Sequence, residues 1–146
     1  MEIYFICTGN TCRSPMAEAI LRGHEIDGVT VRSAGIYAVE GSKISEHAET
    51  LVKKFQLPYS ETSKMVDIKH MQSADYVLTM TEAHKQLLIN MFPAYEQKIE
   101  TLKSFVQDET GQNVLDPYGS NLAGYERTFE ELTQLIDRLA MRLNGG

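Results

Sequence analysis

The sequence predicts a single α/β domain in which a mostly parallel sheet has helices on both faces. The chain has 146 residues with 42% hydrophobic content, and short strand-like apolar runs alternate with segments of helical periodicity. No linker, repeat or low-complexity tract divides it. A chain of this length suits one core and is too short for two, so we expect residues 1–146 to form one domain.

The first apolar run, Ile3–Ile6, is rich in β-branched and aromatic residues and ends at a polar loop that begins with Cys7. This pattern is typical of a buried strand that enters a tight turn. Ser14 and Pro15 then suit the N-cap and first position of a helix, because serine caps free N–H groups and proline has no N–H to lose. The chain is therefore expected to open as strand, loop and helix.

A second strand is predicted at Val29–Ser33, closed by Gly35. From Ser45 onward, apolar residues recur at i, i+3, i+4 and i+7 until Pro58, which is typical of an amphipathic helix. Its apolar positions are Ala48, Leu51, Val52 and Phe55.

The third strand is predicted at Tyr76–Met80, and Thr81 is the expected N-cap of the helix that follows. That helix should end before Pro93, with an inner face of Leu87, Leu88 and Met91.

A weaker strand pattern covers Lys98–Leu102, and a long amphipathic helix ends the chain. Strands that alternate with helices favour right-handed crossovers and a parallel sheet, whose ligands bind beyond the carboxyl ends of the strands. The loop after the first strand lies at that edge, and the polar segment Asn113–Asn121 directly precedes the last helix. The apolar stripe of that helix consists of Leu122, Tyr125, Phe129, Leu132, Ile136, Leu139 and Leu143.

Charge and composition exclude several classes of partner. The formal net charge of -6 repels polyanions, so no nucleic-acid partner is expected. Nothing near Met1 resembles a leader or a membrane segment, so export and membrane binding are not expected either. Two cysteines suit a reducing compartment, which indicates a cytoplasmic protein. Nothing in the sequence predicts an oligomeric state.

The four histidines lack the spacing of metal ligands, and His70 and His84 are predicted to be solvated helix residues without a catalytic role.

The segment Cys7–Ser14 places a thiol at a strand end and a guanidinium six residues later, directly before a helix. Gly9 allows the backbone to curl so that N–H groups point inward, and the helix N-terminus adds partial positive charge. Arg13 matches two phosphate oxygens. The same field is expected to lower the pKa of Cys7, which provides a thiolate that can attack phosphorus. Each residue alone suits ordinary packing or solvation, but the combination favours phosphate chemistry.

Two motifs support a family resemblance. CTGNTCRSP, at Cys7–Pro15, resembles the signature loop of the low-molecular-weight protein-tyrosine-phosphatase family, and DPYG, at Asp116–Gly119, resembles its general-acid loop. The resemblance implies a four-stranded parallel sheet, no metal or other cofactor, and phosphorylated proteins as substrates. It assigns Cys7 as nucleophile, Arg13 as phosphate clamp and Asp116 as acid.

The resemblance also implies that Ser14 stabilises the thiolate and that Asn10, together with Ser33, keeps the loop in shape. Tyr118 is expected to form a wall of the pocket, while Tyr37 suits a wall and an ordinary surface position equally well. The residues expected to bind the substrate are Thr8, Gly9, Asn10, Thr11, Cys12, Ser14 and Tyr118.

Thr11 departs from the aliphatic residue, commonly isoleucine, of the family loop and is similar to the bacterial protein-arginine phosphatase branch. Its hydroxyl adds a donor and an acceptor beside Asp116, which favours a planar guanidinium rich in N–H groups. We therefore expect a phosphatase that acts on phosphoarginine through a phosphocysteine, with phosphotyrosine as the alternative substrate.

Two other classes of protein fit less well. Arsenate reductases share this fold and loop, but they use further cysteines that this chain lacks. A phosphate-binding module would need neither Cys7 nor Asp116. Cys12 has two open interpretations, as a buried filler or as the partner that captures an oxidised Cys7 in a disulfide.

Overall fold

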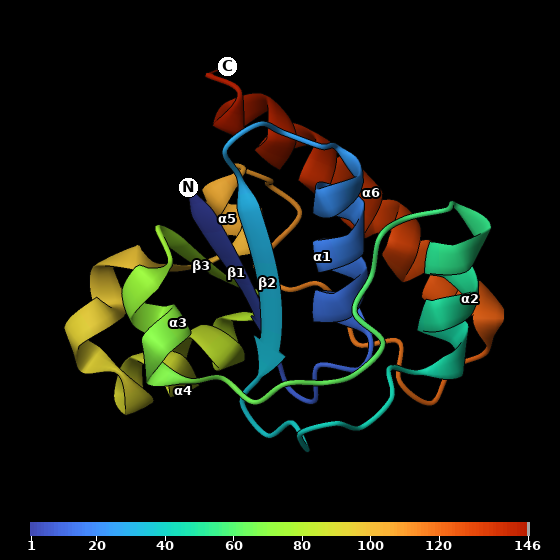
Figure 1. Cartoon of the computed structure of the whole chain (residues 1–146), viewed down its shortest axis with the longest axis horizontal. Helices are drawn as coiled ribbons and strands as arrows, with labels where there is room; N and C mark the ends of the chain where they lie inside the picture. Colours follow the sequence, from blue (N-terminus) through green and yellow to red (C-terminus); the bar gives the residue numbers. More distant parts are fainter. Residues whose placement is uncertain (146) are drawn as a thin grey trace.

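The structure of the protein is a computed structural model, and it describes residues 1–145. Its centre is a sheet of four parallel strands in the order β2-β1-β3-β4 (Figure 1). This confirms the α/β class and the four-stranded parallel sheet expected from the sequence. The strands are β1 (Glu2–Cys7), β2 (Thr30–Gly35), β3 (Tyr76–Thr79) and β4 (Ile99–Thr101).

Helices cover both faces of the sheet, as Figure 1 shows. One face carries the helices α1 (Arg13–Gly23), α2 (Glu46–Lys54), α5 (Leu102–Phe105) and α6 (Leu122–Leu143). The other face carries α3 (Ile68–Ser73), α4 (Glu82–Met91) and the 3-10 helix Pro93–Lys98.

Alternation along the central strand creates the two cores. Ile3 and Phe5 of β1 belong to the core beneath α1 and α6, whereas Tyr4 and Ile6 belong to the core beneath α3 and α4. Successive side chains of a strand point to opposite faces, so a central strand that is buried on both faces must be continuously apolar. The run Ile3–Ile6 therefore predicted its own place in the middle of the sheet.

The predicted cap at Thr81 is confirmed, Ser45 provides a cap that was not predicted, and the predicted cap at Ser14 is wrong. The hydroxyls of Ser45 and Thr81 accept hydrogen bonds from the first turns of α2 and α4. Helix α1, in contrast, begins at Arg13 with Cys12 at the N-cap position and no side-chain cap. Ser14 is the second residue of the helix, two positions beyond the N-cap, and its hydroxyl contacts Cys7 instead.

The predicted inner face of α4 also needs correction. Leu88 is buried, but Leu87 and Met91 are exposed, and the buried stripe of this helix consists of His84 and Leu88. Phe55 lies just beyond α2, is half exposed and stacks on Phe129 of α6 with 5.1 Å between ring centroids. The short helices α3 and α5 were not predicted, because six and four residues carry too little periodicity to detect. None of the helices within residues 1–145 is both long and apolar enough to cross a membrane.

Candidate active site

A cavity of about 230 Å³ lies at the carboxyl edge of the sheet, where β1 passes into the loop that leads to α1. The structure therefore brings the predicted loop and the predicted acid together, although more than 100 residues separate Cys7 from Asp116. Asn10 and Ser14, in contrast, do not line the cavity, and both are buried. The lining consists of Cys7, Thr8, Gly9, Thr11, Cys12, Arg13, Asp116 and Tyr118.

The Cys7 thiol is buried at the bottom of this cavity, and its Sγ lies 2.7 Å from the hydroxyl oxygen of Ser14. Burial raises the pKa of Cys7, whereas hydrogen bonds from Ser14, the charge of Arg13 and the backbone of Asn10 lower it. The expectation of a net depressed pKa for Cys7 is therefore wrong, because burial has the larger effect. The thiolate depends on these three residues for its stability.

Arg13 is tied to the acid loop. Its Nη1 donates to the carbonyl of Val114 at 2.9 Å, and its Nη2 lies 3.6 Å from Oδ2 of Asp116. The guanidinium is buried, while the carboxylate of Asp116 remains 49% exposed. Asp116 also accepts a hydrogen bond from the backbone N–H of Tyr118 at 3.0 Å. Clamp and acid thus face the same cavity, one from its base and one from its rim.

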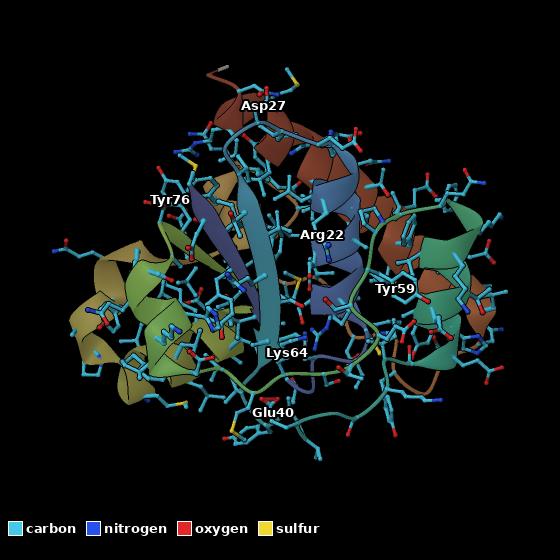
Figure 2. All side chains as sticks on the ribbon, viewed as in Figure 1. Arg22, Asp27, Glu40, Tyr59, Lys64 and Tyr76 are labelled. Atoms are coloured by element: carbon cyan, nitrogen blue, oxygen red, sulfur yellow. The ribbon has the colours of Figure 1, made fainter. Side chains whose placement is uncertain are left out.

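Asn10, rather than Gly9, makes the left-handed turn of the loop. Its φ is 55°, a conformation that non-glycine residues adopt only when neighbours hold them. The backbone N–H of Lys64 donates to Oδ1 of Asn10 at 2.8 Å, and the hydroxyl of Ser63 donates to its carbonyl at 2.7 Å. Figure 2 shows Lys64 beside the carboxyl end of β2. The segment after α2 therefore holds the turn in place.

The side chain of Asn10 connects Cys7 with a buried carboxylate. Its Nδ2 donates to Ser14 Oγ at 2.8 Å and to Ser33 Oγ at 3.0 Å. The hydroxyl of Ser33 in turn donates at 2.5 Å to Oε1 of Glu18, which is only 4% exposed. The expected role of Asn10 and Ser33 in shaping the loop agrees with this geometry.

The direction of these hydrogen bonds follows from Glu18, which the sequence analysis missed. A carboxylate can only accept, so Ser33 must donate to it and must accept from Asn10. Ser14 then accepts from Asn10, and its own proton can go to the sulfur of Cys7 at 2.7 Å, which is much nearer than the carbonyl of Ala34 at 3.5 Å. Glu18 falls one turn after Ser14 on α1, and this spacing on a helix that starts at the loop was the available signal.

Gly35, the last residue of β2, lies directly behind the loop. A Cβ at this position would come within 2.5 Å of the carbonyl oxygen of Thr8 and 2.8 Å of the backbone nitrogen of Asn10. Those distances are shorter than any tolerated contact, so a side chain here would push the loop toward the cavity. Gly35 was predicted to close a strand, and its structural task is to let the loop approach β2.

His84 contradicts its predicted solvation. It is 5% exposed, and its Nε2 lies 2.7 Å from the hydroxyl oxygen of Thr8, while the buried Nδ1 has no hydrogen-bond partner within residues 1–145. Burial and the charge of Arg13 lower the pKa of His84 to about 4, with Asp116 opposing them. The imidazole is therefore neutral near pH 7. His70 is partly exposed and contacts Asp67 far from the cavity.

The remaining predicted residues divide between the cavity and its surroundings. Tyr118 lines the cavity and is 77% exposed, whereas Tyr37 is exposed outside the lining. Cys12 is buried, and its Sγ lies 3.2 Å from the hydroxyl of Tyr125. Both cysteines are free thiols. Among the described residues 1–145, no group of three or more His, Cys, Asp or Glu side chains is placed to hold a metal ion.

The cavity brings a buried thiol together with a curled loop, an arginine and a partly exposed carboxylate. These groups define a cysteine-dependent phosphatase. Comparison with known proteins agrees: residues 2–145 match the model of the low molecular weight phosphotyrosine protein phosphatase family. The chain belongs to this family, and it is a cysteine-dependent protein phosphatase.

Relatives with two kinds of substrate align along nearly the whole chain. A protein-arginine-phosphatase of Geobacillus stearothermophilus is 43% identical over 97% of this chain and 95% of the relative. The low molecular weight protein-tyrosine-phosphatase PtpB of Staphylococcus epidermidis is 36% identical over 97% of this chain and 99% of the relative. The solved structure of a YwlE arginine phosphatase mutant with a phosphorylated active-site serine is 40% identical, covers 99% of this chain and 96% of that one, and superposes with a TM-score of 0.93.

Proposed function

We propose that this phosphatase hydrolyses phosphoarginine residues of proteins through a phosphocysteine intermediate on Cys7. The observation that carries the choice of substrate is the position of Thr11, whose side chain lines the cavity together with Asp116. The chain is similar to an arginine phosphatase along nearly its whole length, which supports the same choice.

The first step transfers the phosphoryl group to sulfur. The thiolate of Cys7 attacks phosphorus, the bond from phosphorus to the guanidine nitrogen breaks, and Asp116 delivers a proton to that nitrogen. The loop N–H groups and Arg13 bind the phosphoryl oxygens, where negative charge concentrates in the transition state. Ser14 donates to the sulfur and stabilises it both as nucleophile and as leaving group.

The second step releases inorganic phosphate. A water molecule enters from the open side of the cavity, Asp116 accepts its proton, and the oxygen attacks phosphorus as the bond from phosphorus to sulfur breaks. Half exposure of the Asp116 carboxylate supports this role, because the acid must exchange protons with both substrate and water. In the mutant relative described above, the active-site serine that replaces the cysteine carries a phosphoryl group, which supports a covalent intermediate.

Pocket chemistry favours a guanidinium over a phenyl ring. A phosphorylated guanidinium is planar and carries several N–H donors, so it gains from hydroxyl and carboxylate acceptors at the rim. Thr11 and Asp116 supply both kinds of acceptor. Phosphotyrosine is the second candidate, because its ring suits the wall that Tyr118 provides and because tyrosine phosphatases are among the relatives.

Exchanging Thr11 for an aliphatic residue tests the substrate. Thr11→Ile should lower kcat/KM on phosphoarginine peptides relative to matched phosphotyrosine peptides by roughly tenfold to a hundredfold, the range that one pocket contact supplies. Both peptides are assayed on both proteins by phosphate release. If the ratio of the two kcat/KM values is unchanged, Thr11 does not select the substrate. If the wild-type protein does not hydrolyse phosphoarginine, phosphotyrosine is the better-supported substrate.

We further propose that the protein works in the cytoplasm and that Cys12 protects Cys7 there. Hydrogen peroxide would oxidise the Cys7 thiolate to a sulfenic acid with release of hydroxide. The Cys12 thiol would then attack the sulfenic sulfur, breaking its S–O bond and releasing water as the disulfide forms. Both sulfurs are free and buried in adjoining parts of the loop, although Cys12 contacts Tyr125 in the reduced protein.

This redox proposal predicts that a thiol reductant restores peroxide-treated wild-type protein. Cys12→Ser, which cannot form the disulfide, should proceed to sulfinic or sulfonic acid and stay inactive, because those states resist thiols. Mass spectrometry of the loop peptide with an activity assay measures both outcomes. Full recovery of Cys12→Ser would leave Cys12 as a packing residue.

A further inference from the structure

Several parts of the fold hold the phosphate loop, each by a different bond. The carbonyls of Cys7 and Thr8 accept from the backbone just after β2, with distances of 3.0 and 2.9 Å. The segment after α2 holds Asn10, and Ser45 at the start of α2 donates to the carbonyl of Thr11 at 2.9 Å. These partners follow the edge strand β2. On the other side of β1, the segment after β4 binds Arg13 through Val114 and Asp116, and the segment after β3 contributes a further residue at the start of the loop.

That residue is His84, at the third position of α4. Helix α4 follows β3, and β3 pairs with β1 in parallel register, so the first turn of α4 lies at the same edge of the sheet as the loop. Thr81 caps this turn by accepting from the backbone N–H of His84 at 3.1 Å, which fixes the position of the imidazole. The ring then reaches Thr8 with its Nε2 at 2.7 Å.

Thr8 is a sensitive point for such a contact. It directly follows Cys7, it lines the cavity, and the residue is exposed to solvent. Its backbone N–H belongs to the curled loop that, on the function proposed above, surrounds the phosphoryl group. A small rotation of Thr8 would therefore change the loop's N–H direction and the pocket wall together.

We propose that His84 is a positioning residue of the phosphate site: through its hydrogen bond to Thr8 it holds the first turn of the loop in the geometry that receives the phosphoryl group. The bond comes from the β3 side of β1, whereas the other contacts to the first turn of the loop come from the segments after β2 and α2. His84 does not touch the substrate and acts through Thr8.

Simple packing does not explain this histidine. An aliphatic residue would fill the same space, whereas the imidazole buries one nitrogen, Nδ1, that has no partner in the described chain. Buried polar atoms without partners are unfavourable, so the compensating feature is the bond from Nε2 to Thr8. Because the ring is neutral near pH 7, it supplies this bond without adding a charge that would compete with Arg13 for phosphate.

A double-mutant cycle tests the proposal with hydrolysis of a small aryl phosphate, which does not depend on the protein substrate. His84→Leu and Thr8→Val each remove one partner of the hydrogen bond while keeping similar volume. Each should lower kcat/KM by about tenfold, and the double variant should be no worse than the single ones, because the bond is lost only once. The inhibition constant of inorganic phosphate should rise in the same variants.

Two further variants separate positioning from stability. His84→Gln places an amide near the position of Nε2 and should recover most of the activity lost in His84→Leu. Leu88→Ala creates a cavity one turn along the same helix, without contact to Thr8, and should lower Tm while kcat/KM of the folded protein stays near wild type. Losses that multiply in the double variant, or an unchanged kcat/KM in His84→Leu, would overturn the proposal.

Discussion

At the scale of single residues, the chemistry depends on a chain of hydrogen bonds in which the buried carboxylate of Glu18 decides which groups donate. Glu18 accepts, Ser33 therefore donates to it, and Asn10 fills the acceptor position on Ser33. The remaining Nδ2 proton of Asn10 binds Ser14, so the hydroxyl proton of Ser14 can go to the sulfur at 2.7 Å, nearer than the Ala34 carbonyl at 3.5 Å. This arrangement opposes the effect of burial on the pKa of Cys7.

The residue to change is Ser33, because Ser60 provides a matched control. Both hydroxyls donate to Glu18, Ser60 at 3.0 Å, but of the two only Ser33 also contacts Asn10. Ser33→Ala should raise the pKa of Cys7, so that the pH midpoint of its alkylation by iodoacetate moves upward, and kcat/KM should fall by about tenfold. A higher pKa leaves less thiolate at a given pH, so alkylation requires a higher pH and kcat/KM falls.

Ser60→Ala should leave the alkylation midpoint near that of the wild-type protein, although the bond to Glu18 is lost. If both variants shift the midpoint equally, the effect is a general loosening around Glu18, and the directional chain has no special role.

At the scale of elements, the loop depends on the close approach of β1 and β2. The two strands pair from Glu2 opposite Thr30 to Cys7 opposite Gly35, and the loop then folds back over the end of β2. The absent side chain of Gly35 is what permits this return. The end of β2 and the catalytic loop therefore both require a residue without a side chain at position 35.

Gly35→Ala tests that constraint. The added methyl group would meet backbone atoms of Thr8, Gly9 and Asn10, which cannot move away without distorting the loop. We expect kcat/KM to fall by about a hundredfold and the free energy of unfolding to fall by about 1–3 kcal/mol. Steady-state kinetics and urea denaturation measure the two effects.

Gly28→Ala is the control for stability alone. Gly28 has a φ of 77° at the opposite end of β2, and a Cβ there would meet no neighbour within 4 Å. This variant should be destabilised by backbone strain of about 1 kcal/mol with kcat/KM unchanged. An active Gly35→Ala variant would show that the loop does not need the close approach.

At the scale of the whole molecule, sequence reasoning reached what is local and missed what is brought together across the sheet. The Cys7 to Arg13 spacing and the apolar run of β1 lie within single segments, so their patterns are visible. His84, Glu18 and Gly35 matter because of contacts with residues on other elements, which neither periodicity nor motif spacing displays. The rule that parallel strands share a carboxyl edge could have placed His84 near the loop, because it follows β3 within a few residues.

The pKa of Cys7 shows a second limit of sequence reasoning. A loop with an arginine and a helix N-terminus predicts a low pKa, but the depth of burial is a property of the folded cavity and acts in the opposite direction. The same is true of Asn10, whose left-handed backbone depends on Ser63 and Lys64 rather than on a glycine. Residue type alone could not reveal either feature.

The most direct test of the account is to find the phosphoryl group on the residue that receives it. The Cys7→Ser variant is incubated with a phosphoarginine peptide, digested, and analysed by mass spectrometry. The account predicts that turnover is lost and that a phosphoryl group appears at position 7 of the loop peptide, because a serine alkoxide is a far poorer leaving group than a cysteine thiolate. Continued turnover by this variant, or a phosphoryl group on a different residue, would contradict it.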